Sequence, residues 1–120
     1  MRALLVGVAG AAGALSRYGI AVAIGPQLFP WATLGINLSG SFVLAFVVTW
    51  ATEGHLPADV ATGITVGFLG AYTTFSTFSW ETFVMAHTHR LPTAIVYVVV
   101  SLAGGVGAAA GGYALGRALR

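Results

Sequence analysis

The chain has 120 residues, of which 58% are hydrophobic and only 7% charged, and its mean hydropathy is +0.91. A water-soluble domain carries about 25% charged residues, so this composition excludes an ordinary soluble globular protein. A helix that spans a bilayer needs about 20 apolar residues, and the length therefore accommodates about four spans with short loops. The net charge of +2 is not concentrated in a basic patch, so we expect no nucleic-acid partner.

Two further features of the composition narrow the class of protein. Cysteine is absent, which excludes disulfides, zinc-thiolate sites and thiol chemistry. Glycine occurs 17 times, about twice its usual frequency. Because small residues let membrane helices approach closely, this glycine content predicts a tightly packed helical assembly.

The first predicted span covers residues 3–24 and ends at the turn-forming sequence 25–27, Gly-Pro-Gln. Arg2 followed by a short apolar stretch also fits a cleavable signal peptide. The apolar run continues for seven residues past Arg17, which favours a retained span. Arg17 itself is a cation inside or at the edge of this run, so it either has a function in the membrane or snorkels to the surface.

The second predicted span, residues 31–51, carries a polar stripe. Thr33, Asn37 and Ser41 follow one another at a spacing of four residues, which places them on one helix face. Hydrogen bonds between helices explain Thr33 and Ser41 as well as a pathway does. The Asn37 amide is costlier to bury in a membrane, and the lining of an ion pathway would use its donors.

The third predicted span, residues 60–86, has three glycines before a polar and aromatic run at 72–80. Glycine and β-branched threonine are weak helix formers, so we expect the helix to break between Gly70 and Thr74. Backbone freed by such a break is tolerated in a membrane only inside a protein-lined cavity.

Two aromatic residues after the expected break allow two interpretations. Phe75 and Phe78 lie three residues apart on one helix face, a spacing usual for core packing. The edge of a phenylalanine ring is also electropositive, so two ring edges facing a pore would solvate an anion without binding it strongly.

The last predicted span, residues 91–119, carries Tyr97 and Ser101 four residues apart. Their hydroxyls either donate hydrogen bonds to a passing anion or bond to a neighbouring carbonyl. The later glycines of this span are more simply interpreted as a packing surface.

The arrangement of the spans bears on orientation and on activity. Four spans place both termini and the middle linker on one side of the membrane. This side has three arginines and the other at most two, so the positive-inside rule specifies no orientation and the chain is expected to insert both ways. No catalytic constellation is present, and we expect no enzyme activity.

Three motifs in chain order carry a resemblance to a known family. The motifs occupy residues 10–18 (GAAGALSRY), 33–42 (TLGINLSGSF) and 67–81 (GFLGAYTTFSTFSWE). The chain resembles the Fluc (CrcB) fluoride ion channels over essentially its whole length. The resemblance implies an all-α membrane protein with four transmembrane helices, the third of them broken, that forms a dual-topology antiparallel homodimer in the inner (plasma) membrane.

The resemblance also implies the function and the ions. Such a protein exports fluoride passively and relieves fluoride toxicity, through two pores at the subunit interface. A structural sodium ion (Na+) lies at the centre of the dimer, and the family's sodium-coordinating backbone carbonyls correspond here to Gly70 and Thr73. Two other classes compete: a small proton-coupled multidrug-type transporter, which would want a carboxylate in the first span where this chain has Arg17, and an accessory membrane subunit without conductance.

The same resemblance assigns roles to side chains. Arg17 corresponds to the arginine at the vestibule mouth, where a positive charge attracts anions, and Glu81 falls on an acidic position of the family whose role is less defined. One turn beyond Ser101, where a further hydroxyl would continue the polar track, this chain has Gly105. The residues assigned to the fluoride pore are Asn37, Phe75, Ser76, Thr77, Phe78, Tyr97 and Ser101.

Overall fold

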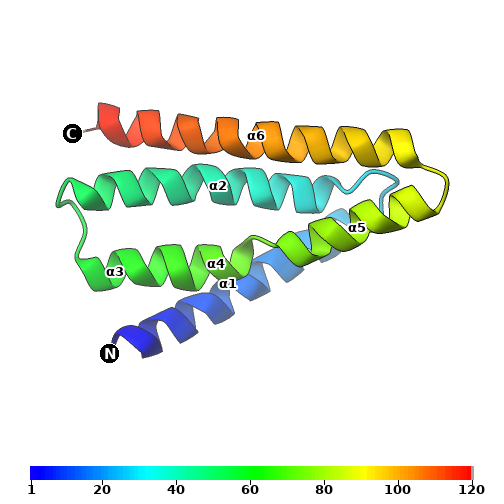
Figure 1. Cartoon of the computed structure of the whole chain (residues 1–120). Helices are drawn as coiled ribbons and strands as arrows, with labels where there is room; N and C mark the ends of the chain where they lie inside the picture. Colours follow the sequence, from blue (N-terminus) through cyan, green and yellow to red (C-terminus); the bar gives the residue numbers. More distant parts are fainter. Residues whose placement is uncertain (120) are drawn as a thin grey trace.

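The structure is a computed structural model that describes residues 1–119, and all regular secondary structure in that part of the chain is helical (Figure 1). Two long helices come first, then a third segment made of four short helical pieces, then a last long helix. The elements in order are α1 (Arg2–Ile24), α2 (Trp31–Thr52), α3 (Ala58–Thr62), the π-helix η1 (Gly63–Leu69), α4 (Gly70–Tyr72), α5 (Phe75–His87) and α6 (Leu91–Ala118).

Three helices, α1, α2 and α6, are long and apolar enough to cross a membrane. The third segment extends from residue 58 to residue 87, but each of its pieces is much shorter than a span. The N-terminus, the end of α6 and the 53–57 connection lie at one end of the molecule, and the other two connections lie at the opposite end (Figure 1). The four segments therefore run up and down along one axis, as a four-span chain requires.

The third segment is broken, as its sequence predicts, but only at the end of the expected window. Gly70 keeps helical backbone angles (φ −62°, ψ −34°), and the helix continues through Tyr72. The break consists of two threonines in extended conformation, Thr73 (φ −76°, ψ 156°) and Thr74 (φ −148°, ψ 115°). Extended angles suit β-branched side chains, whereas Gly70 tolerates either conformation.

Close contacts between backbones hold α1 against η1. A Cβ atom added to Gly13 would collide with the Phe68 carbonyl group, and one added to Gly67 would lie 2.7 Å from the Val6 carbonyl oxygen. Only glycine fits at either position, so the glycine content has the packing function expected for it.

Helices α2 and α6 run parallel to one another, because contacts advance in the same direction along both. Near the start, Leu34 and Tyr97 belong to one buried cluster. Further along, a Cβ atom added to Gly104 would lie 3.2 Å from Leu38 Cδ2, and one added to Gly112 would collide with the Phe42 carbonyl group. The polar stripes predicted on these two helices are thereby brought side by side.

Candidate functional site

Asn37 on α2 holds the break in the third segment. Its amide Nδ2 donates to the Thr74 carbonyl oxygen at 3.1 Å, and its Oδ1 accepts from the Thr74 backbone N–H at 2.8 Å. In a continuous helix this N–H would donate to the carbonyl of Gly70. Asn37 thus satisfies the backbone that the break exposes, and one of its two amide hydrogens remains available.

The side chain of Thr74 caps the helix that follows. Its Oγ1 accepts from the backbone N–H of Thr77 at 3.2 Å, donates to Thr77 Oγ1 at 3.0 Å and lies 3.3 Å from Ser76 Oγ. A threonine at this position satisfies one of the four free N–H groups at the start of α5. Ser76 and Thr77, both predicted pore residues, therefore lie in the capping network of α5.

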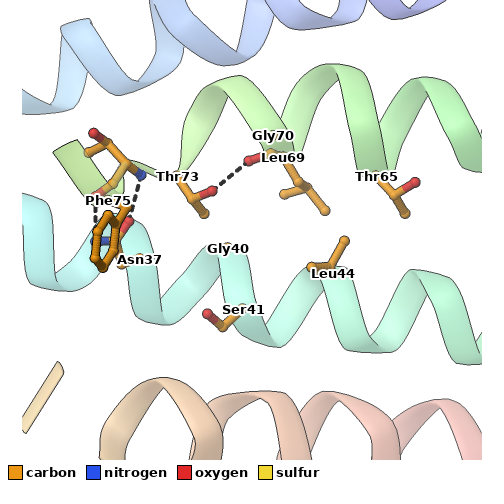
Figure 2. Close-up of a pocket in the computed structure, with 10 residues that line it drawn as sticks. Asn37, Gly40, Ser41, Leu44, Thr65, Leu69, Gly70, Thr73 and Phe75 are labelled. Atoms are coloured by element: carbon orange, nitrogen blue, oxygen red, sulfur yellow. Dashed lines mark hydrogen bonds between the residues drawn. The ribbon is translucent and has the colours of Figure 1, made fainter. Parts of the chain in front are cut away.

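The carbonyl groups of Gly70 and Thr73 both lose their usual helical donors at the break. Thr74 N–H donates to Asn37, and Thr77 N–H donates to Thr74 Oγ1. Gly70 and Thr73 line a cavity of about 260 Å³ together with Asn37 and Phe75, as Figure 2 shows. Carbonyl oxygens suit a hard cation, and within residues 1–119 there is no cluster of three His, Cys, Asp or Glu side chains.

Glu81 accepts hydrogen bonds on both carboxylate oxygens from two other helices. Thr33 Oγ1 on α2 donates to Oε1 at 2.7 Å, and the Tyr97 hydroxyl on α6 donates to Oε2 at 2.9 Å. Tyr97 is completely buried. Two of the predicted polar stripes thus meet at a carboxylate whose partners no sequence spacing reveals, because the three residues lie on three separate segments.

Ser101 has a buried hydroxyl with no hydrogen-bond partner among the described residues. Most serine and threonine hydroxyls in these helices instead donate to a carbonyl of their own helix, as Thr49 does to Ala45 at 2.7 Å and Thr82 does to Phe78 at 2.8 Å. A buried hydroxyl without a partner costs about 1–3 kcal/mol. Its donor is therefore available to any acceptor that reaches it.

The two predicted pore aromatics differ in their surroundings. Phe75, at the start of α5, is 78% exposed, and it lines the cavity beside Asn37 (Figure 2). Phe78 packs against the buried core formed by α2, α5 and α6, with its ring centroid 5.8 Å from that of Phe75 and 5.1 Å from that of Tyr97. The Phe78 ring therefore connects the exposed aromatic with the buried tyrosine.

Arg17 lies beside the same group of residues. It lines a cavity of about 240 Å³ together with Thr33 and Thr77. These two threonines also line a larger cavity of about 540 Å³ that Glu81 reaches. Within residues 1–119 Arg17 forms no ion pair or hydrogen bond, so its charge is not neutralised by a partner in that part of the chain.

Comparison with known proteins identifies a matching family and several sequence relatives of this chain. The family model described as "CrcB-like protein, Camphor Resistance (CrcB)" matches residues 4–113. A protein from Bacillus thuringiensis subsp. konkukian, named "Fluoride-specific ion channel FluC 1", is 46% identical over 117 residues, which are 94% of this chain and 85% of the relative.

Two further relatives have similar names. One from Geobacillus kaustophilus, named "Fluoride-specific ion channel FluC 2", is 44% identical over 92% of this chain and 89% of its own length. One from Thermus thermophilus, named "Fluoride-specific ion channel FluC", is 39% identical over 98% of this chain and 97% of its own length. These relatives are named as channels, in agreement with the prediction that the chain is not an enzyme.

Proposed function

This chain belongs to the CrcB family, and from that membership we propose that it is a fluoride-selective ion channel of the cell's inner (plasma) membrane. It exports fluoride passively, down the electrochemical gradient, and so relieves fluoride toxicity. Among the features of this chain, the buried and unpartnered hydroxyl of Ser101 supports the proposal most strongly. A donor kept in that state inside a membrane protein is suited to an acceptor that arrives from outside the chain.

Fluoride is a small, strongly hydrated anion and a strong hydrogen-bond acceptor, so closely placed donors must replace its water. The proposed pathway offers the remaining amide hydrogen of Asn37, the hydroxyl of Ser101 and the ring edges of Phe75 and Phe78. All are neutral groups, which stabilise an anion without trapping it. Larger halides gain less from the same narrow set of donors.

Tyr97, Ser76 and Thr77 are engaged within the chain. The Tyr97 hydroxyl donates to Glu81, and it reaches fluoride only when that hydrogen bond opens. Ser76 and Thr77 act through the cap of α5, which places the positive end of that helix at the break. In the proposed pathway these three residues complement the free donors of Asn37 and Ser101.

We further propose that two copies assemble as an antiparallel homodimer with dual topology and two pores along the interface. Phe75 is 78% exposed in the single chain although it belongs to the proposed pore, so a second copy is needed to enclose it. The nearly equal distribution of arginines over the two ends supports insertion in both orientations. Surrounding lipid covers the remaining apolar surface.

The residues at the break fit a sodium ion. The carbonyls of Gly70 and Thr73 have lost their usual helical donors, and carbonyl oxygens are the ligands that a hard cation prefers. We propose that these two carbonyls from each copy hold Na+ at the centre of the dimer. When bound there, sodium supplies a positive charge that offsets the carbonyl dipoles and links the two copies.

Arg17 attracts anions to the mouth of the pathway in this proposal. Its charge has no partner within residues 1–119, and it lines a cavity together with Thr33 and the pathway residue Thr77. A positive charge in a cleft raises the local concentration of anions. The first span carries no carboxylate, which argues against a proton-coupled transporter.

Efflux from liposomes that contain the purified protein tests the channel. With equal outward gradients, we expect fluoride to leave rapidly and chloride to leave no faster than from protein-free liposomes. Equal efflux of both anions, or efflux of neither, would refute the proposed function; the second result is the one expected of an accessory subunit.

A separate labelling experiment tests dual topology. The chain has no cysteine, so Glu53→Cys introduces a single thiol in the connection between α2 and α3. We expect a membrane-impermeant maleimide to label part of this population from each face of the membrane. Labelling from one face alone would contradict dual insertion.

A further inference from the structure

The polar stripes of α2 and α6 lie in register along a shared contact. At one level Thr33 and Tyr97 both donate to the Glu81 carboxylate. Two turns further along each helix, a Cβ atom added to Gly105 would lie 3.9 Å from Ser41 Oγ. Both pairs are separated by eight residues on their own helix, so the helices present matching levels along this stretch.

At the level of Gly105, α6 has no side chain to offer a donor, and Ser41 on α2 occupies the space beside it. Nothing else lies within 4 Å of the position where a Gly105 Cβ would be. A serine hydroxyl in a helix often bonds to the carbonyl four residues earlier. Within residues 1–119 the Ser41 hydroxyl makes no such bond and no other hydrogen bond, so its donor is unused.

Ser41 also lines two cavities. It lines the cavity of about 260 Å³ that includes Asn37 and Phe75, and it lines a second cavity of about 390 Å³ that continues along α6 to Ala109 and Tyr113. Figure 2 shows the Ser41 side chain on the side of α2 that faces α6, opposite to Gly70 and Thr73. A route that joined the two cavities would therefore pass this hydroxyl.

We propose that Ser41 is an anion-coordinating residue of the pathway and supplies from α2 the hydroxyl that Gly105 does not supply from α6. This inference rests on the proposed fluoride channel and adds a donor to it. The order of donors along the pathway is then Asn37 and Ser101, followed by Ser41. The pathway therefore still has a hydroxyl donor at the level of Gly105, and this donor comes from α2 instead of α6.

Moving the hydroxyl between the two helices tests the inference. Ser41→Ala removes the donor with almost no change in volume, and Gly105→Ser restores a hydroxyl on the facing helix, where an added Cβ meets only Ser41 Oγ. Ser39→Ala is the control on the same helix, because the Ser39 hydroxyl is already engaged, with the Ile36 carbonyl and with the Tyr72 hydroxyl. Fluoride efflux is measured from liposomes for the wild type, both single alanine variants and the double variant Ser41→Ala/Gly105→Ser.

We expect Ser41→Ala to lower the fluoride efflux rate about tenfold, the size of effect of one hydrogen bond to an ion. Ser39→Ala should conduct like the wild type, and the double variant should regain most of the lost rate. Recovery in the double variant also shows that loss of the Ser41 hydroxyl does not unfold the protein.

Three results would overturn the inference: a Ser41→Ala rate equal to that of the wild type, equal losses in Ser41→Ala and Ser39→Ala, or no recovery in the double variant. Failure of the wild type itself to conduct fluoride would instead refute the underlying channel. The two failures are therefore distinguishable in one set of liposomes.

Discussion

The contact between α2 and α6 is built differently in its two halves. In the hydroxyl half, Thr33, Asn37 and Ser41 of α2 lie alongside Tyr97 and Ser101 of α6. In the glycine half, Phe42, Phe46 and Thr49 of α2 contact Gly112 and Gly116 of α6. A Cβ atom added to Gly116 would lie 2.9 Å from Thr49 Cβ, and the Thr49 hydroxyl already donates to the Ala45 carbonyl at 2.7 Å. The two helices are thus closely packed in the glycine half, whereas the hydroxyl half keeps hydrogen-bond donors available.

This difference shows how one pair of helices combines rigidity with solvation of an ion. Close backbone packing replaces the hydrophobic driving force that is missing between helices in lipid, and it leaves no donor unused. The free hydroxyls of Ser41 and Ser101 lie outside the part of the contact where Gly112 and Gly116 pack. We expect substitutions in the glycine half to affect folding, and those in the hydroxyl half to affect transport.

The largest effect is expected from adding a methyl group to the glycine half. Gly112→Ala places a Cβ against the Phe42 carbonyl group, so the helices must separate, and we expect the free energy of unfolding to fall by about 3 kcal/mol or more. Gly107→Ala is the control, because nothing lies within 4 Å of its added Cβ. Thermal unfolding in detergent measures both. Equal stability of the two variants would mean that the close packing at Gly112 does not stabilise the contact between α2 and α6.

The next effect concerns the support of the hydroxyl half. Asn37→Ala removes both hydrogen bonds to Thr74 and leaves a buried N–H and a buried carbonyl without partners. We expect the free energy of unfolding to fall by about 2 kcal/mol, together with a loss of fluoride efflux. Thr62→Val serves for comparison, since the Thr62 hydroxyl bonds only within its own helix. If Asn37→Ala had the same free energy of unfolding as the wild type, the two hydrogen bonds from Asn37 would not be needed to stabilise the break.

A smaller effect is expected at the exposed aromatic. Phe75→Ile removes a ring that is 78% exposed, so the stability of the single chain should not change. Loss of the ring edge should lower fluoride efflux about fivefold, since aromatic contacts are worth roughly 1 kcal/mol. Phe83→Ile, at another exposed position of α5, controls for loss of apolar surface. Unchanged efflux in Phe75→Ile would reduce this ring to a packing role.

The smallest effect is expected at the mouth of the pathway. Arg17→Gln removes one charge that attracts anions, and efflux at low salt should fall about threefold. The difference from the wild type should shrink at high salt, because ions screen the attraction. Arg2→Gln is the control, since Arg2 is paired with Asp59 at 2.6 Å. A difference that does not depend on salt would assign Arg17 a structural role.

Much of the fold was predictable because a membrane restricts the choices. Apolar runs of about 20 residues lead to spanning helices, and the observed helices begin and end within two residues of the predicted bounds. The break was predictable from glycine and threonine propensities, but its position at Thr73 and Thr74 depends on Asn37, a partner 37 residues away. The π-helical form of Gly63–Leu69 has no signal in spacing or composition.

The site was predictable to the extent that its residues share a helix. Spacing placed Thr33, Asn37 and Ser41 on one face, and Tyr97 and Ser101 on another. Spacing does not say which of these donors is already engaged. The hydroxyls of Thr33 and Tyr97 donate to the Glu81 carboxylate and are therefore engaged. Which hydroxyls are engaged and which are free depends on contacts between helices.

The most direct measurement is fluoride efflux from liposomes for Ser101→Ala beside the wild type, with thermal unfolding of both proteins. The Ser101 hydroxyl has no partner among residues 1–119, so its removal should leave the free energy of unfolding unchanged or slightly higher. The fluoride efflux rate should nevertheless fall about tenfold, because the hydroxyl is a donor to the ion. Wild-type efflux in Ser101→Ala would contradict the assignment of the hydroxyl half as the fluoride pathway.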